Sequence, residues 1–250
     1  MSDAWTHLRA HTSARIGLPR AGNAVTTREH LAFQMAHAQA QDAVHDALDV
    51  ESFLAGLRRR DLPALAVRSV AHDRATYLKR PDLGRTLSDS GHALLQTLPP
   101  NPADLAIVIA DGLSARAVKR HALALLDMLL PVLQQEQWTL APIVVVEQGR
   151  VAIGDDIGAA LNAAIVAVLI GERPGLSSPD SLGVYLTWAP RGGLTDGERN
   201  CISNIRPEGL SYGNAAARMM FLLTEARRRK LTGVMLKDET LALAVLPASS

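Results

Sequence analysis

The segment Leu105-Ala106-Ile107-Val108-Ile109-Ala110-Asp111-Gly112-Leu113-Ser114 decides the predicted fold of this chain. Its first six residues form a short apolar run without polar alternation, which is typical of a strand that is covered on both faces. Asp111-Gly112 ends the run, and Ser114 stands where the N-cap of a following helix is expected. The segment therefore predicts a strand, a tight turn and a helix that reaches about Gln135.

The same order of strand, turn and helix is repeated downstream. Apolar runs at 143–146 and 165–170 are followed by polar, glycine-bearing turns, with a short helix expected near 155–163. A fourth candidate strand covers 183–188, and a last helix covers about 213–230. This alternation predicts an α/β fold with a Rossmann-like, doubly wound and mostly parallel sheet.

The N-terminal part has a different pattern. Apolar residues recur at helical spacing over 26–57 and predict one helix that ends before Pro63. A short strand is possible at 65–70, and a further helix is expected near 86–97. The proline cluster at 98–102 is the candidate linker. We therefore expect a mainly helical region at 1–100 and a Rossmann-like α/β domain at 101–250.

Charge and cysteine content narrow the class of protein. The chain has 26 basic and 25 acidic residues, and a net charge of +1 gives no global attraction for nucleic acid or anionic membranes. No apolar stretch approaches the roughly 20 residues of a membrane span, and no signal peptide is recognisable. The single cysteine, Cys201, cannot form an internal disulfide. A soluble, cytoplasmic protein without nucleic-acid or membrane binding is expected.

Ligand chemistry is expected at the carboxyl ends of the strands, where loops converge and helix N-termini point their donors. The candidate strand ends are the polar segments 111–114, 147–151, 171–178 and 200–205. No Gly-x-Gly-x-x-Gly and no P-loop motif occurs, which counts against nicotinamide cofactors and P-loop nucleotides. The histidines are scattered and no cysteine pair exists, so no metal ligand is predicted. Basic runs at 58–60 and 227–230 lie at predicted helix ends without interleaved aromatic residues, so they favour solvated helix ends.

A nucleophilic enzyme is the weaker alternative. Ser114 follows a strand, but Arg116 stands where the Gly-x-Ser-x-Gly motif requires glycine, so an N-cap role is favoured. Cys201 has no histidine close in sequence to activate it. A self-sufficient nucleotide-binding enzyme with Ser114 or Cys201 as its nucleophile remains a hypothesis, and no catalytic residue is predicted.

Several long motifs of this chain resemble one family. They are Glu147-Gln148-Gly149-Arg150-Val151, Val168-Leu169-Ile170-Gly171-Glu172-Arg173-Pro174-Gly175-Leu176 and Asn200-Cys201-Ile202-Ser203-Asn204-Ile205. Together with 80–85, 109–114 and 231–238, they resemble the small subunit of ethanolamine ammonia-lyase over most of residues 10–238. Several long motifs in one order are far more specific than any single strand-end glycine.

The resemblance implies an adenosylcobalamin-dependent lyase that converts ethanolamine to acetaldehyde and ammonia by a radical mechanism. In such enzymes a large subunit, folded as a TIM barrel, holds ethanolamine and the catalytic side chains. The small subunit covers the cobalamin at the interface of a hetero-oligomer, and the cofactor carries the difficult chemistry. Matching motifs imply cofactor contact for Val151, Glu172 and Cys201, with Arg150 as a neighbouring candidate.

These residue types suit a corrin. A carboxylate such as Glu172 can accept N–H groups from the amides of the corrin rim, while Val151 and Cys201 offer compact apolar contact. The alternative is a non-catalytic α/β assembly subunit that does not touch the cofactor. Some family members carry an N-terminal extension linked with packaging into a bacterial microcompartment. This chain begins almost directly at its expected folded part, so a cytoplasmic location is expected, with a microcompartment as the alternative.

Overall fold

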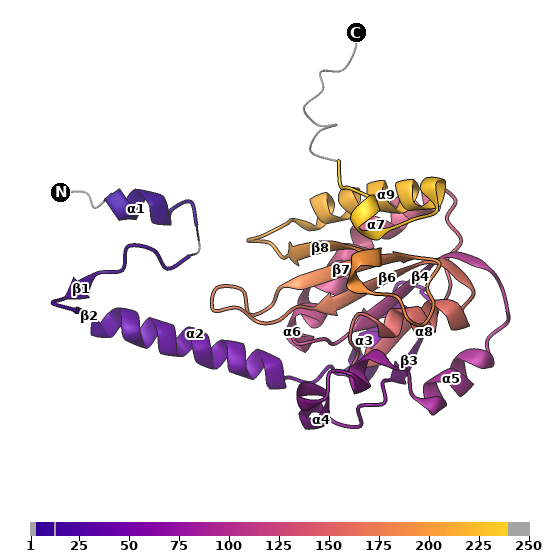
Figure 1. Cartoon of the computed structure of the whole chain (residues 1–250), viewed down its shortest axis with the longest axis horizontal. Coiled ribbons are helices and arrows are strands. Elements are labelled where there is room, and N and C mark those ends of the chain that lie inside the picture. Colours follow the sequence, from indigo (N-terminus) through magenta and orange to yellow (C-terminus); the bar gives the residue numbers. More distant parts are fainter. Residues whose placement is uncertain (1–3, 13, 240–250) are drawn as a thin grey trace, which may run out of the picture.

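The computed structural model describes residues 4–12 and 14–239, and a six-stranded mixed sheet forms its centre (Figure 1). The strands lie in the order β3 (Ala64–Arg68), β5 (Ile143–Glu147), β4 (Ala103–Ala110), β6 (Ala163–Gly171), β7 (Leu182–Trp188) and β8 (Arg199–Ile205). The first four are parallel, whereas β7 is antiparallel to β6 and β8 is antiparallel to β7.

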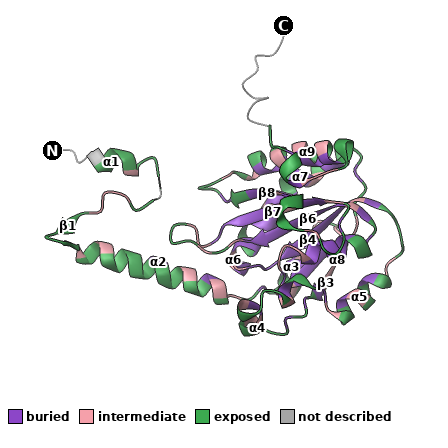
Figure 2. Cartoon of the chain, in the orientation of Figure 1, coloured by how far each residue is buried: buried purple, intermediate pink, exposed green. Residues whose placement is uncertain are grey.

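Helices cover both faces of the sheet (Figures 1 and 2). On one face, α3 (Val50–Arg58), α7 (Leu123–Gln135) and α9 (Tyr212–Arg229) pack against one apolar cluster. On the other face, α5 (Asp89–Gln96) and α8 (Ile153–Ala160) pack against a second cluster. Along β4, Leu105, Ile107 and Ile109 enter the first cluster while the intervening residues enter the second. Burial on both faces explains why this strand shows no polar alternation.

The chain leaves neighbouring strands toward opposite faces. After β4 it enters α6 (Ala115–Ala117), the π-helix Val118–Ala122 and α7 on the first face, whereas after β5 it enters α8 on the second. Such a change of direction opens a crevice at the carboxyl ends of the two strands. The predicted N-cap is confirmed, because the Ala117 N–H donates to Ser114 Oγ at 3.3 Å.

The predicted α/β class is confirmed, and the sheet is mixed, with four parallel strands and two antiparallel ones; the finer Rossmann-like, doubly wound description stays a prediction. The sequence pattern did not predict strand β8 (Arg199–Ile205), because only Arg199, Ile202 and Ile205 are buried along it. The segment around Cys201 was interpreted as a strand end, and that placement was wrong. Cys201 lies inside β8 and pairs with Tyr185 of β7.

The helix predicted at 26–57 is two helices. α2 (Thr27–His45) ends at Asp46, and α3 begins after Asp49, whose carboxylate accepts the Ser52 N–H at 3.1 Å. The N-cap fixes a new helix start and so interrupts the periodic pattern. α2 projects from the body as a mostly exposed arm, preceded by α1 (Ala4–Arg9) and the hairpin of β1 (Arg20–Ala21) and β2 (Ala24–Val25) (Figure 2).

The division expected at residue 100 stays a prediction, but the sheet takes strands from both sides of that position. β3 precedes it and pairs in parallel with β5, and the proline segment 98–102 connects α5 to β4. The remaining elements are α4 (Arg74–Lys79) and the 3-10 turns Leu83–Arg85, Asp196–Glu198 and Gly233–Met235. In the part of the chain that the structure describes, no helix is long and apolar enough to cross a membrane.

Candidate functional site

Two adjoining cavities share the turn between β5 and α8. The strand-end cavity, of about 240 Å³, is lined among others by Tyr77, Gly112, Arg150, Val151, Glu172 and Tyr185. The arginine cavity, of about 360 Å³, is lined among others by Arg85, Arg150, Val151, Ala152, Asp196 and Arg199. Because Arg150 and Val151 line both, a ligand in one cavity can extend toward the other.

The structure brings three of the four sequence-predicted site residues together. Arg150, Val151 and Glu172 line the strand-end cavity although 21 positions separate the turn after β5 from the end of β6. Cys201 does not line this cavity; it lies one strand further, paired with the cavity residue Tyr185. The strand-end cavity therefore gathers residues of two family motifs, whereas Cys201 of the third motif lies in β8 beside the lining residue Tyr185.

The turn after β4 forms the floor of the crevice. Gly112 adopts a φ of +60°, and a Cβ there would lie 2.2 Å from the Gly171 carbonyl oxygen. Asp111 is 2% exposed, and its Oδ1 accepts the Gly149 N–H at 3.1 Å. Burial raises the pKa of Asp111 to about 6, although Arg74, 3.5 Å away, acts in the opposite direction. The carboxylate thus holds the turns after β4 and β5 together.

α4 supplies two side chains that the sequence did not mark as site residues. Arg74 donates to the Gly112 carbonyl at 2.8 Å and to the Val44 carbonyl at 2.8 Å, so it joins the crevice to the end of the arm. Tyr77 is fully buried and donates its hydroxyl to the Gly149 carbonyl at 3.1 Å. Burial raises the pKa of Tyr77, so the phenol stays neutral. An arginine and a tyrosine on a short helix gave no periodic or motif pattern that could have identified them.

Arg150 is a cation with unused donors. Its guanidinium stacks on the Tyr77 ring, 4.2 Å from the centroid, and donates one hydrogen bond of 3.3 Å to the Tyr77 carbonyl. Its Nε is buried without a hydrogen-bond partner, and no carboxylate of the described ranges pairs with it. A buried donor without a partner costs about 1–3 kcal/mol. The guanidinium itself is half-buried and lines the cavity, so its Nη1 can donate to an acceptor that is not part of the chain.

Glu172 links the end of β6 to the two antiparallel strands. Its Oε2 accepts from the Ser181 hydroxyl and from the Asn204 N–H at 3.2 Å, and its Oε1 accepts from the Ser203 hydroxyl at 2.6 Å. Each carboxylate oxygen can accept about two hydrogen bonds. Oε1 therefore retains room for one donor of a ligand, while its chain bonds fix the position of Glu172.

Neither candidate nucleophile is activated. Ser114 is fully buried, and its hydroxyl donates to the Pro179 carbonyl at 3.0 Å while it caps the following helix. Surrounding protein and the nearby Glu172 carboxylate raise the pKa of the Cys201 thiol, although its hydrogen bond with Tyr185 acts to lower it. A thiol with a raised pKa is a poor nucleophile at neutral pH. The geometry disfavours the hypothesis of a self-sufficient nucleophilic enzyme.

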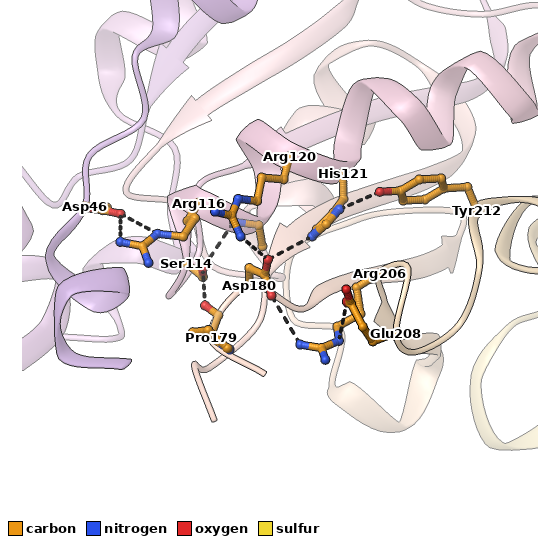
Figure 3. Close-up of polar contacts among 11 residues, drawn as sticks. Asp46, Ser114, Arg116, Arg120, His121, Pro179, Asp180, Arg206, Glu208 and Tyr212 are labelled. Atoms are coloured by element: carbon orange, nitrogen blue, oxygen red, sulfur yellow. Dashed lines mark hydrogen bonds and ion pairs between the residues drawn. The ribbon is translucent and has the colours of Figure 1, made fainter. Parts of the chain in front are cut away.

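A separate polar cluster fixes the loop that follows Glu172 (Figure 3). Near the end of this loop, Asp180 contacts Arg120 at 2.6 Å, Arg206 at 3.3 Å and the His121 ring at 3.6 Å. Burial alone would raise the pKa of Asp180, but its contacts with Arg120, His121 and Arg206 hold it below its ordinary value. The cluster joins the π-helix, this loop and the segment after β8, so it stabilises the strand that follows.

The described residues contain no group of three His, Cys, Asp or Glu side chains that could hold a metal ion. The candidate ligands of the crevice are instead carboxylate, guanidinium and apolar groups from several turns. The fold and this site define an α/β protein with a ligand crevice at the carboxyl ends of its parallel strands, covered on one flank by two antiparallel strands.

Comparison with known proteins identifies the family. The model of the ethanolamine ammonia-lyase light chain (EutC) family matches residues 2–237, and the chain belongs to this family. A relative from Azotobacter vinelandii is 59% identical over 238 residues, which cover 94% of this chain and 88% of the relative. Relatives from Xanthomonas campestris pv. campestris and Pseudomonas aeruginosa are 57% identical over 240 residues and 56% identical over 241 residues. These cover 95% and 94% of this chain and 88% and 87% of the relatives. All three are named ethanolamine ammonia-lyase small subunit.

Proposed function

We propose that this chain is the small subunit of an adenosylcobalamin-dependent ethanolamine ammonia-lyase and that its strand-end cavity contacts cobalamin at the interface with a large subunit. The observation that carries the proposal is the convergence of Arg150, Val151 and Glu172 on one cavity. These residues come from two separate family motifs. Family membership supports the reaction, and the cavity supports the role of this chain in it.

The residues of the crevice fit the edge of a corrin. Glu172 Oε1 can accept an amide N–H, the half-buried guanidinium of Arg150 can donate to an oxygen, and Val151 offers an apolar surface. Drug-sized ligands occupy pockets of about 300–1,000 Å³. Cobalamin is larger than such ligands and needs more space. A cavity of about 240 Å³ can therefore take only one edge of the cofactor. The remaining surface would have to be covered by the partner.

Within this proposal the chain binds and orients. Cobalamin, when bound, supplies the radical that starts the conversion of ethanolamine. Glu172 accepts from the corrin rim, and its bonds to Ser203 and Asn204 keep its carboxylate in place. Tyr77 supports Arg150 from behind, and the buried Asp111 fixes the turn that precedes Arg150. Substrate and proton-transfer groups belong to the large subunit.

The test compares cobalamin binding by the large subunit alone, by the pair, and by the pair that carries Glu172→Gln. Binding is followed by spectrophotometric titration. The pair should bind more tightly than the large subunit alone. Loss of a charge-assisted hydrogen bond should weaken binding by about 1.5–3 kcal/mol, which is about ten- to hundredfold.

Ser203→Ala is the matched control, because it removes a chain donor to Glu172 Oε1 and leaves the carboxylate. Binding should change less in this variant than in Glu172→Gln. Equal losses in the two variants would assign Glu172 to chain packing. An unchanged affinity in Glu172→Gln would refute its contact with the cofactor.

The exposed arm favours a second candidate function, that of an assembly subunit without cofactor contact. Leu31, Phe33 and Met35 on α2 are 58%, 44% and 63% exposed, an arrangement that suits a partner surface. In that case the large subunit alone would retain cobalamin as well as the pair does. Removal of apolar arm side chains would then weaken only the association of the subunits.

A further inference from the structure

The arginine cavity has an uneven charge distribution. Arg199 is balanced by a bidentate pair with Asp155, at 2.7 Å for both bonds. Asp196 also lines the cavity, but its side chain is 93% exposed and lies 3.7 Å from Arg199 Nε. Arg85 and Arg150 have no carboxylate partner within residues 4–12 and 14–239. The cavity therefore has two guanidinium groups whose charge the chain does not neutralise.

Close backbone packing sets these two arginines side by side. The Arg150 N–H donates to the Gly84 carbonyl at 2.7 Å, directly before Arg85 in the sequence. A Cβ at position 84 would lie 2.9 Å from both the Arg150 stem and the Tyr77 ring. Only glycine permits this approach, so the turn Leu83–Arg85 is fixed against the start of α8.

The chemistry of the cavity suits an anion with several oxygens. Guanidinium groups present planar forks of donors that match phosphate oxygens. Among the described residues, the half-buried Arg150 side chain makes only one hydrogen bond, from Nη2 to the Tyr77 carbonyl at 3.3 Å, so its guanidinium has a donor left for an anion in the cavity. The cavity also includes Ala152, the N-cap residue of α8, where the positive end of the helix dipole favours negative charge.

We propose that the arginine cavity binds a phosphate ester through Arg85 and Arg150, and that this ester is the phosphodiester of the nucleotide tail of cobalamin. The second part rests on the proposed function. The two cavities meet at Arg150 and Val151, so a corrin edge in the strand-end cavity places its tail within reach of the arginine cavity. Arg85 is then a specificity-determining residue for a corrinoid that carries a phosphodiester.

The test uses the complex of this chain with its large subunit and compares Arg85→Met with the wild type. Arg85 is exposed, and methionine keeps an unbranched apolar side chain, so folding should be preserved. The ligands are cobalamin and cobinamide, the same corrin without its nucleotide and phosphodiester. Binding is followed by the change in the corrin absorption spectrum and does not depend on turnover.

Arg85→Met should weaken cobalamin binding about ten- to hundredfold and leave cobinamide binding unchanged. Added potassium chloride should weaken cobalamin binding more in the wild type than in Arg85→Met, because salt screens exposed charges. Arg58→Met is the matched control, since Arg58 is an exposed arginine of α3 and does not line the cavity. It should leave the binding of both ligands unchanged.

Unchanged cobalamin binding, or equal losses for cobalamin and cobinamide, would overturn the assignment to the phosphodiester. Inorganic phosphate separates the two possible sources of the anion. It should compete with cobalamin and not with cobinamide; calorimetric binding of phosphate that displaces neither would show a site for free phosphate and overturn the assignment to the tail. If the pair binds no more cobalamin than the large subunit alone, the proposed function fails. The loss of phosphate binding in Arg85→Met would then test the anion site by itself.

Discussion

Arg199 and Arg150 line the same cavity, but among the described residues only Arg199 is paired with a carboxylate. The Arg199 side chain is 2% exposed, and its two Nη atoms also donate to the Thr187 hydroxyl at 3.0 Å and the Leu194 carbonyl at 3.2 Å. Arg150 is half-buried, makes one side-chain hydrogen bond of 3.3 Å and has no carboxylate partner in the described ranges. The Arg199 guanidinium is paired with a carboxylate of the fold, whereas the Arg150 guanidinium has an aromatic ring and one hydrogen bond to a carbonyl.

This difference separates charges that stabilise the fold from charges that are available to a ligand. A buried charge that is matched within the chain joins elements, here α8 to β8 through Asp155 and Arg199. A charge that is left unmatched at a cavity costs free energy in the isolated chain and is recovered only when a ligand binds. Asp111 lies between these cases, since it is deeply buried but has a single arginine contact of 3.5 Å. Arg199, Asp111 and Arg150 therefore form a series, ordered by how far the chain pairs their charges, that mutation can test.

The largest effect is expected at the matched pair. Asp155→Ala leaves the Arg199 guanidinium buried without its carboxylate, and loss of one partner of a buried ion pair costs about 3–5 kcal/mol. The free energy of unfolding of the full chain, measured by urea denaturation, should fall by that amount. The double variant Asp155→Ala/Arg199→Met should recover most of the loss, because it removes the unpaired charge.

Asp196→Ala is the control for this pair. Asp196 approaches the same guanidinium, but its side chain is 93% exposed and water screens the contact. Its removal should change the free energy of unfolding by less than about 0.5 kcal/mol. A loss below about 1 kcal/mol in Asp155→Ala would contradict a structural role for the matched pair.

An intermediate, pH-dependent effect is expected at Asp111. Its pKa is about 6 in the folded chain and about 3.9 in the unfolded chain. Between these values the folded chain binds more protons, so the free energy of unfolding falls as the pH rises, by about 3 kcal/mol in total. Asp111→Asn lacks this titration, and its stability relative to the wild type should therefore increase from pH 4 to pH 7.

The measurement is the difference between the two unfolding free energies at each pH. His121 has a lowered pKa, mainly because of burial, and it titrates in both proteins in the opposite sense. Its contribution cancels in the difference. A difference that does not vary with pH would mean that Asp111 keeps an ordinary pKa. Asp111 would then be a charge that is matched within the chain, like Arg199.

Much of this fold followed from local pattern. Buried parallel strands appear as unbroken apolar runs, so β4, β5 and β6 could be predicted with nearly correct bounds. β8 could not, because an edge strand in which only every third residue is buried, with polar residues such as Ser203 between them, resembles a polar loop. The break between α2 and α3 was missed because it depends on the Asp49 cap, which adds no change in apolar period.

The site was predictable only in part. Arg150, Val151 and Glu172 could be proposed because they follow strands and lie in motifs typical of the family. Tyr77 and Arg85 come from the segment between β3 and β4, and their approach to Arg150 depends on tertiary packing around Gly84. The pairing of Asp155 with Arg199 could not be predicted either, because the two residues lie 44 positions apart in the sequence. A sequence can indicate a charge near a strand end, but it does not indicate whether the fold neutralises it.

The smallest effect on stability is expected at the unmatched charge. Arg150→Met keeps a stem that can pack against Gly84 and Tyr77, and it removes a buried Nε without a partner. Loss of the ring contact and of the 3.3 Å hydrogen bond opposes this gain, and each is worth about 1 kcal/mol. The free energy of unfolding should therefore change by less than about 1 kcal/mol, while the pair loses cobalamin affinity. A loss of about 3 kcal/mol or more would place Arg150 with Arg199, because the guanidinium would then stabilise the fold as a matched charge does.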